Sequence, residues 1–381
     1  MRIAYVTTYD SSDVSQWSGL GFYIAEALRA AGLAVAELGP VDAGPDLVLL
    51  LKKAAYLGLM WQRHLIDREP AVLRRYAGIA AQHLREMAAD VVFSPGTIPV
   101  SHLHCRQPIV FWTDATFAGM REFYPEFSRL SAETIRNGDR MERAALTNCR
   151  LAIYSSDWAA RSAIDHYGVD PKKIAVVPFG ANLDVDPGLE EAKAFVAARP
   201  TSECRLLFLG ADWQRKGGPT ACEVARLLNE RGLPTTLTVV GCWPNLGEPV
   251  PDFVRIAGPL SKAVPAQKAE LYALLAQSHF LVLPSQADCT PVVFGEANAF
   301  AVPCLASDVG GVASIVVDGA NGQRFSRIDP AAAYCNYIEA LYRRYADYKS
   351  LALGSFARYK QRLNWRVAGA AVRSLIERHC A

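Results

Sequence analysis

The sequence lacks the features that mark several large classes of protein. Lys and Arg together number 40 and Asp and Glu 38, so neither sign of charge is in excess. A protein that binds nucleic acid by neutralising phosphates needs a basic excess, and we therefore expect no nucleic-acid partner. No apolar run approaches the roughly 18–20 residues of a membrane-spanning helix. No internal repeat is evident.

The nine cysteines also lack a pattern. Their number is odd and no two are spaced as Cys-x-x-Cys, which argues against a disulfide framework and a thiolate zinc site. The N-terminal stretch MRIAYVTTYD is predicted as a first strand, without the longer apolar segment of a signal peptide. We therefore expect a cytoplasmic protein, either free or resting at the inner face of a membrane.

What the sequence does contain is a large apolar fraction, 51%, in a regular alternation. Short β-branched runs alternate with longer Ala/Leu/Arg-rich stretches, the pattern of parallel sheets covered by helices. Strands are expected at 3–8, 47–51, 91–95, 109–114, 151–156 and 174–180, and again at 204–210, 236–241, 253–258, 279–285 and 302–308. We predict an α/β protein of two Rossmann-like, doubly wound domains that face a cleft, where such domains bind ligands.

Pro and Gly residues between the two series of strands indicate where one domain ends. We expect an N-terminal domain over residues 1–182, a linker over 183–202 and a C-terminal domain over 203–355. Residues 356–381 are expected to form a C-terminal helix that packs back on the N-terminal domain.

The loop after the first strand holds Gly19 and Gly21 just before a helix. Glycines there let backbone amides approach an anion at the helix N-terminus. A dinucleotide-binding fingerprint would need a third glycine at position 24, where the chain has Ile24. A tight strand-to-helix connection explains the two glycines equally well.

Two loops of the second half carry more chemistry. In Gly210–Gly218, Arg215 and Lys216 stand beside two glycines that open a helix, an arrangement suited to a diphosphate. Further on, Asp288 and Glu296 straddle the end of a strand and the start of a helix, where they could bind a sugar and a ribose. A solvated basic turn and an exposed pair of helix acids are the plainer alternatives.

These pieces, in this order, resemble the retaining GT-B glycosyltransferases of family 4 (group 1) over nearly the whole chain. The family's G-x5-K-G loop is matched by Gly210 with Lys216-Gly217, and its E-x7-E element by Asp288-x7-Glu296. Its Gly-Gly turn is matched by Gly310-Gly311, its D-G-x-N-G turn by Asp318–Gly322, and its terminal helix by Asn364-Trp365. Each motif is weak alone, and the ordered set is strong.

The resemblance implies roles for individual residues. Lys216 and Arg215 would hold the donor diphosphate, Glu296 the donor ribose, and Asp288 the hydroxyls of the transferred sugar. Thr290, Val292 and Val293 would complete the donor-binding loop, and Gly19 and Gly21 would shape the acceptor-side domain. Asp114, Lys216 and Asp288 are the candidate catalytic residues, although Asp114 is equally well explained as a helix N-cap.

Three positions depart from the family pattern. Ala211 stands where an Arg is usual, Asp288 replaces the leading Glu, and Thr113-Asp114 replaces a His-Asp pair. Arg215 could supply the charge that Ala211 lacks.

The activity that the resemblance implies is a hexosyltransferase type of transfer. A sugar would pass from a nucleotide-sugar substrate to an acceptor hydroxyl with retention at the anomeric carbon, without metal or cofactor, in glycan or glycoconjugate synthesis. The alternatives are a nucleotide-sugar epimerase of the same fold and a non-catalytic scaffold that binds sugar nucleotides. The Asp184-Val-Asp186 sequence spells a metal-binding motif of another fold, but it lies in the expected linker.

Residues 52–85 form one further feature, with seven Lys or Arg against two Asp or Glu. Tyr56, Leu57, Leu59, Met60, Trp61 and Tyr76 are interleaved with these charges. The segment could be a basic amphipathic surface for an anionic membrane that carries a lipid-linked acceptor. A helix packed on the first domain explains it at least as well.

Overall fold

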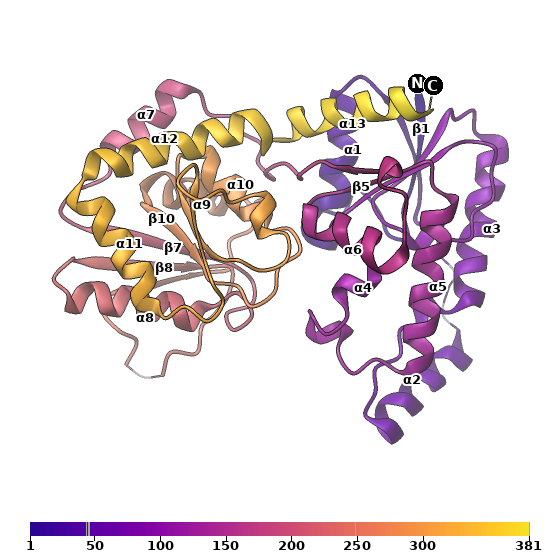
Figure 1. Cartoon of the computed structure of the whole chain (residues 1–381), viewed down its shortest axis with the longest axis horizontal. Helices are drawn as coiled ribbons and strands as arrows, with labels where there is room; N and C mark the ends of the chain where they lie inside the picture. The colour runs from indigo at the N-terminus through magenta and orange to yellow at the C-terminus, as the bar shows by residue number, and fades with distance from the viewer. Residues whose placement is uncertain (43, 45, 248, 381) are drawn as a thin grey trace. The chain divides into compact units, whose positions relative to one another are not determined.

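The computed structural model describes residues 1–42, 44, 46–247 and 249–380 (Figure 1). The chain divides into two compact units. The first unit contains Met1–Pro178 and the C-terminal residues from Trp365 onward, and the second contains Phe179–Asn364. Ala381, at the end of the expected C-terminal helix, lies outside the described residues.

The first unit is built on a parallel sheet of six strands, in the order β2-β1-β3-β4-β5-β6. The strands are β1 (Arg2–Val6), β2 (Ala34–Leu38), β3 (Val91–Ser94), β4 (Ile109–Thr113), β5 (Leu151–Tyr154) and β6 (Ile174–Val176). The helices are α1 (Leu20–Ala30), α2 (Leu47–Met60), α3 (Pro70–Glu86), α4 (Phe117–Met120), α5 (Ala132–Asn148), α6 (Asp157–Tyr167) and α13 (Trp365–Cys380). The residues of β3, β4 and β5 are buried throughout, as expected for strands covered on both faces.

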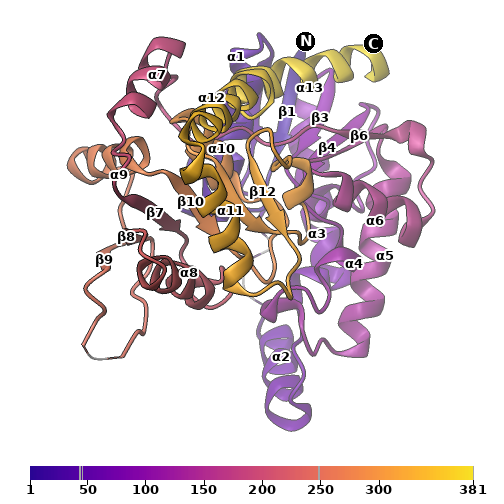
Figure 2. The same cartoon turned by 60° about the vertical axis from the view of Figure 1, so that its left-hand side comes forward.

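The second unit repeats this plan with its own core (Figure 2). Its six parallel strands lie in the order β12-β11-β10-β7-β8-β9. They are β7 (Cys204–Leu209), β8 (Thr235–Val240), β9 (Val254–Gly258), β10 (Phe280–Leu283), β11 (Cys304–Ser307) and β12 (Gly322–Phe325). The helices are α7 (Leu189–Ala198), α8 (Gly218–Glu230), α9 (Pro265–Gln277), α10 (Val292–Ala299), α11 (Ala331–Arg343) and α12 (Tyr345–Arg362).

Both sheets have the strand order of a doubly wound fold, so the expected fold class is confirmed. In each sheet the chain starts at an inner strand, builds outward on one side, and then crosses to build on the other. The crossing lies between β1 and β3 in the first sheet, and between β7 and β10 in the second. Ligands of such sheets bind beyond the carboxyl ends of the strands at this switch point.

The strand expected at 47–51 is wrong, because these residues begin helix α2. Asp46 caps the helix by accepting hydrogen bonds from the amides of Val48 and Leu49 at 3.1 and 3.2 Å. A short apolar run fits a strand or a helix equally well, so periodicity alone could not decide. Strands β2 and β12 were not foreseen.

The expected linker at 183–202 differs from what the structure shows. The segment lies inside the second unit and contains α7, whose Ala192 and Val196 are buried in that unit's core. Its Pro and Gly residues flank a packed helix, so they do not indicate a flexible connection.

The chain returns to the first unit through its last helix. Helix α12 ends in the second unit, and after Leu363 and Asn364 the chain enters α13, which packs on α1. A Cβ on Gly369 would lie 2.4 Å from the carbonyl oxygen of Ala27, so the two helices approach closely. Within the described residues, no helix combines the length and apolarity that crossing a bilayer requires.

Candidate functional site

Three loops follow the carboxyl ends of β7, β10 and β11 in the second unit, at its switch point. The first, after β7, turns sharply into α8. Gly217 adopts a left-handed φ of +79°, and a Cβ there would lie 2.0 Å from the carbonyl oxygen of Pro284. Only glycine allows the loop after β7 to pass so close to the loop after β10.

This close approach brings Lys216 and Asp288 together. The Lys216 ammonium forms an ion pair with Asp288 Oδ2, and the two side chains are only 13% and 7% exposed. The amide of Gly311, in the loop after β11, donates to the Asp288 carbonyl oxygen at 3.1 Å. Two residues 72 positions apart therefore form one charged centre. The sequence marked both of them.

Arg215 lies beside this centre. Its Nη1 donates to the carbonyl oxygen of Ala287 at 2.9 Å, and its Nε lies 3.6 Å from Asp212 Oδ2. Its backbone carbonyl also accepts from the amide of Gln286 at 2.8 Å. Arg215 thus ties the loop after β7 to the loop after β10, with a cation next to Lys216. The hydroxyl of the neighbouring Ser285 is buried without a hydrogen-bond partner.

Thr290, Val292 and Val293 lie where the chain enters α10. Pro291 is the N-cap of this helix and Val292 its first residue. Thr290 is buried, and its hydroxyl donates to the carbonyl oxygen of Cys289 at 2.7 Å. Val293 packs against the core of the unit. The first amides of a helix have no carbonyl partner within it, so this end favours an anion.

Glu296 lies one turn into α10 and is 3% exposed. Its Oε1 accepts a hydrogen bond at 2.6 Å from Lys262, whose ammonium also donates to the carbonyl oxygen of Asn182 at 2.8 Å. The sequence analysis missed Lys262. It lies in a short connection between β9 and α9 with no motif of its own, so only the fold shows that it faces Glu296.

In the first unit, the loop after β1 has an unusual backbone. Trp17, Ser18 and Gly19 have φ values of 45°, 56° and 78°, all in the left-handed region. Residues other than glycine rarely adopt this backbone conformation, because their Cβ is crowded there. Such strained residues are found mostly at functional sites, where the shape of a loop must be precise. Gly19 then caps α1.

Gly21 makes room for a tyrosine that the sequence analysis did not consider. A Cβ on Gly21 would lie 2.6 Å from the Tyr9 hydroxyl oxygen. The Gly21 carbonyl oxygen also accepts from the Tyr5 hydroxyl at 2.7 Å. The Tyr9 hydroxyl is buried and has no hydrogen-bond partner.

Asp114 follows the carboxyl end of β4 and is half-buried. It is not a helix N-cap, because Thr116 caps α4 by accepting from the amide of Gly119 at 3.0 Å. Burial raises the pKa of Tyr9, and the negative charge of Asp114 raises it further. The structure thus brings Asp114 near Tyr9 and Gly21 at the carboxyl edge of the first sheet.

Asp184 and Asp186 are each held by different partners. Asp184 pairs with Lys268 and accepts from Tyr272, while Asp186 accepts at 2.5 Å from Lys360 and at 3.0 Å from Tyr359. Each carboxylate is already balanced by a lysine.

Within the described part of the chain, one group has the spacing of metal ligands: His64, Glu69 and Glu133. The ammonium of Lys52 lies 2.7 Å from a carboxylate oxygen of each glutamate. This cation bridges the two acids, and the cluster is a partly buried ion network that joins α2 to α5.

Comparison with known proteins adds two family matches. Residues 22–185 match the model described as Glycosyltransferase Family 4, and residues 203–344 match Glycosyl transferases group 1. D-inositol 3-phosphate glycosyltransferase 2 of Catenulispora acidiphila is 28% identical over 247 residues, which cover 59% of this chain and 55% of that protein. The chain spans about half the length of the curated relatives it matches.

Solved structures are similar over the whole chain. Sucrose-phosphate synthase from Thermosynechococcus elongatus aligns with a TM-score of 0.68 at 16% identity, covering 99% of this chain and 98% of that one. Anabaena Alr3699/HepE in complex with UDP-glucose aligns with a TM-score of 0.62 at 14% identity, covering 99% and 100%. These likenesses and the two doubly wound sheets show the GT-B fold. The two family matches show that the chain belongs to glycosyltransferase family 4.

Proposed function

We propose that this protein transfers a sugar from a nucleotide-sugar donor to an acceptor hydroxyl, with retention at the anomeric carbon and without a metal ion. The observation that carries the proposal is the charged centre of Lys216 and Asp288 at the switch point of the second sheet. HepE, which has the same fold, is known in complex with UDP-glucose.

The donor diphosphate would lie against Lys216, Arg215 and the first amides of α10. As the bond from the sugar to the diphosphate breaks, negative charge grows on the leaving phosphate. Fixed positive groups in a half-buried site stabilise that charge without a metal. Lys216 already has a buried partner in Asp288, so its position is set before any donor arrives.

Asp288 would accept hydrogen bonds from hydroxyls of the transferred sugar, while Glu296 would accept from those of the ribose. Lys262 holds Glu296 Oε1, which leaves Oε2 for the ribose. In a front-face reaction, the acceptor oxygen bonds to the anomeric carbon on the side the phosphate leaves. The acceptor proton would pass to the departing phosphate oxygen. Asp114, which follows β4, is our candidate catalytic residue in the first unit.

The test is a search for donor and product. Nucleotide-sugars, with UDP-glucose first, are screened for thermal stabilisation. A ligand at 100 times its dissociation constant should stabilise the fold by about 2.7 kcal/mol. The stabilising donor is then incubated with candidate acceptors in EDTA, and the anomeric configuration of the product is read by NMR.

The outcomes separate the alternatives. Transfer that needs an acceptor, survives EDTA and retains configuration supports the proposal. Conversion of the donor alone would show an epimerase, and binding without any turnover would show a scaffold. Activity that returns only with Mg²⁺ or Mn²⁺ would refute metal independence.

We further propose that the protein contacts a membrane surface through α2. This helix has no buried residue, and seven of its apolar side chains with the adjoining Trp61 are strongly exposed: Leu47, Val48, Leu50, Leu51, Leu57, Leu59 and Met60. Figures 1 and 2 both show α2 projecting from the rest of the first unit. Lys52 and Tyr56 hold one side of α2 to the first unit. The many exposed apolar side chains on the rest of the helix form a broad surface that suits a lipid environment.

In the structure, apolar residues of α2 are better placed for membrane contact than the basic residues that the sequence suggested. Of the seven cations in residues 52–85, Lys52, Arg68 and Arg75 already form ion pairs with carboxylates. Tyr56 is also engaged, because it donates to Glu133 at 2.9 Å and stacks on His64. The apolar tip of the helix is thus the stronger anchor, with Trp61 suited to the interface.

Flotation with lipid vesicles tests this proposal. A variant with Leu57, Leu59 and Met60 changed to Ser should lose most of its binding to both neutral and anionic vesicles. Ile328→Ser, at a side chain that is 88% exposed in the second unit, should bind like the wild type. Equal flotation of the triple variant and the wild type would refute the proposal.

A further inference from the structure

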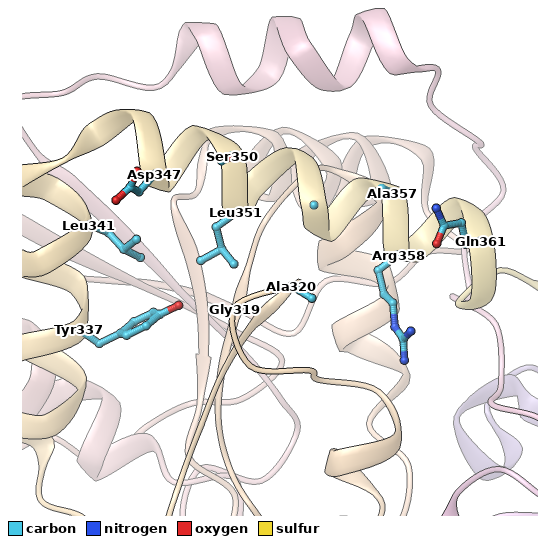
Figure 3. Close-up of a pocket in the computed structure, with 11 residues that line it drawn as sticks. Gly319, Ala320, Tyr337, Leu341, Asp347, Ser350, Leu351, Ala357, Arg358 and Gln361 are labelled. Atoms are coloured by element: carbon cyan, nitrogen blue, oxygen red, sulfur yellow. The ribbon is translucent and has the colours of Figure 1, made fainter.

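The second unit has a pocket that none of the proposed chemistry uses. It has a volume of about 580 Å³ and lies between α11, α12 and the turn at Gly319 and Ala320 (Figure 3). This turn immediately precedes β12. Because the sheet is parallel, the pocket lies at the opposite edge from the loops that follow β7, β10 and β11. It is therefore separate from the proposed donor site.

The pocket owes its shape to a glycine of α12. A Cβ on Gly354 would lie 2.5 Å from the carbonyl oxygen of Ala320, so the helix touches the turn at this point. On either side of the contact, Leu351 and Arg358 extend from α12 into the space, and Tyr337 points its hydroxyl toward it from α11 (Figure 3). The floor is thus apolar, with polar groups around it.

Arg358 carries an unbalanced charge in this pocket. The side chain is half-buried, and its Nε is buried without a hydrogen-bond partner. Among the residues that the structure describes, no carboxylate forms an ion pair with its guanidinium. Burial and the nearby positive charge of Arg362 lower the pKa of Arg358. A buried N–H donor without a partner costs free energy of folding, and an acceptor that binds in the pocket would satisfy it.

The one acid in the lining does not balance this cation. Asp347 lies at the opposite end of the lining from Arg358 (Figure 3). Its Oδ2 is 3.0 Å from the Nε of Arg344, with which it forms an ion pair. Gln361 and Ser350 add neutral hydrogen-bonding groups to the lining. The free charge of the pocket is therefore positive.

We propose that this pocket binds a small ligand with an apolar body and one oxyanion group, a carboxylate or a phosphate, which pairs with Arg358. The guanidinium fork matches both oxyanions with two parallel hydrogen bonds. Leu341, Leu351 and the ring of Tyr337 would cover the apolar body. The site is independent of the proposed transfer reaction and could be loaded with or without a donor.

Calorimetric titration tests the proposal with three probes of one shape: phenyl phosphate, benzoate and the neutral benzyl alcohol. We expect saturable binding of one or both anions at one site per chain, and none of benzyl alcohol. The preferred anion then tells a phosphorylated ligand from a carboxylic acid. Arg358→Gln should weaken anion binding at least tenfold, and the exposed Arg362→Gln less than threefold.

Two further variants keep the result decisive. Ala357 lines the pocket from an exposed position, so Ala357→Phe should fill it without disturbing the core and abolish binding. Lys216→Ala should bind the probes like the wild type, since the donor loops are not involved. The proposal is overturned if neither anion binds saturably, or if folded Arg358→Gln or Ala357→Phe binds with wild-type affinity. Binding lost only in Lys216→Ala would assign the probes to the donor loops.

Discussion

The two units share one strand order, yet they prepare their switch points in different ways. In the second unit, paired charges are already in place: Lys216 with Asp288, and Lys262 with Glu296. In the first unit, the backbone provides the shape, through the left-handed residues Trp17 to Gly19 and the contact of Gly21 with Tyr9.

This difference indicates what each unit is suited to bind. Ion pairs with little exposure to water hold their geometry and keep a strong field, which suits a charged ligand such as a diphosphate. A strained glycine loop instead fixes where backbone and aromatic groups lie, which suits recognition by shape. The same scaffold is thus specialised by its loops rather than by its sheet.

The sharpest test of the comparison is Lys216→Ala. Loss of one fixed donor to the leaving phosphate should lower the rate of transfer by roughly 10²–10³-fold. Lys360→Ala is the matched control, because that lysine pairs with Asp186 elsewhere in the same unit. Transfer kinetics and thermal unfolding are measured for both. Normal turnover by a well-folded Lys216→Ala would remove Lys216 from the donor site.

A smaller effect is expected at the second ion pair. Lys262→Ala should weaken nucleoside diphosphate binding about tenfold, the scale of one charge-assisted hydrogen bond, because Glu296 loses the group that orients it. KM for the donor should rise more than kcat falls, and Lys262→Arg should restore most of the affinity. If kcat alone changes, or Arg gives no rescue, Lys262 does not position Glu296.

The first unit should respond through packing rather than charge. Gly21→Ala places a methyl group 2.6 Å from the Tyr9 hydroxyl oxygen and should destabilise the fold. Overpacking of this kind costs about 1–3 kcal/mol. Adding Tyr9→Phe should recover part of the loss, measured by urea unfolding. If the changes in the free energy of unfolding simply add in the double variant, the side chain at position 9 moves away from the new methyl group without cost.

The last test concerns a buried acid of the first unit. Burial raises the pKa of Glu142 to about 7, although Thr97 donates to its Oε2 at 2.8 Å. Between pH 4.5 and 7 the folded state holds a proton that the unfolded state has lost, so stability falls as pH rises through this window. The slope can reach about 1.4 kcal/mol per pH unit.

Urea unfolding between pH 4.5 and 8 measures this slope. Glu142→Gln should flatten it, because the amide cannot titrate, whereas the exposed Glu86→Gln should leave it unchanged. An unaltered slope in Glu142→Gln would place the titration on another group.

The sequence marked Lys216 and Asp288, which the structure brings together in the second unit, for a physical reason. Lys216 and Asp288 lie in loops that follow strands, and Glu296 lies one turn into the helix after the second of these loops. Parallel strands bring such segments together at one edge of the sheet. Lys262 and Tyr9 could not be found in this way, because neither stands in a spaced motif. Lys262 and Tyr9 acquire their neighbours only when the loops that carry them pack against other parts of the fold. The spacing of residues in the sequence does not show this packing.

The same limit explains the errors in the secondary structure. The run from Leu47 to Leu51 is as apolar as a buried strand, but its side chains are largely exposed on α2. An apolar run predicts a buried strand only if its side chains are buried in the fold. The side chains of a projecting helix are exposed, so the prediction fails there. Likewise, α7 stands between prolines and glycines that resemble a linker, while Ala192 and Val196 complete a core.

The return of α13 to the first unit has a consequence for how the protein is made. Helix α1 emerges from the ribosome early, whereas the helix that covers it is translated only after the entire second unit. Since translation adds about 5–20 residues per second, the apolar face of α1 stays uncovered for on the order of tens of seconds. During this interval the nascent first unit is a natural client for chaperones, and its last step of folding must wait until α13 has been translated.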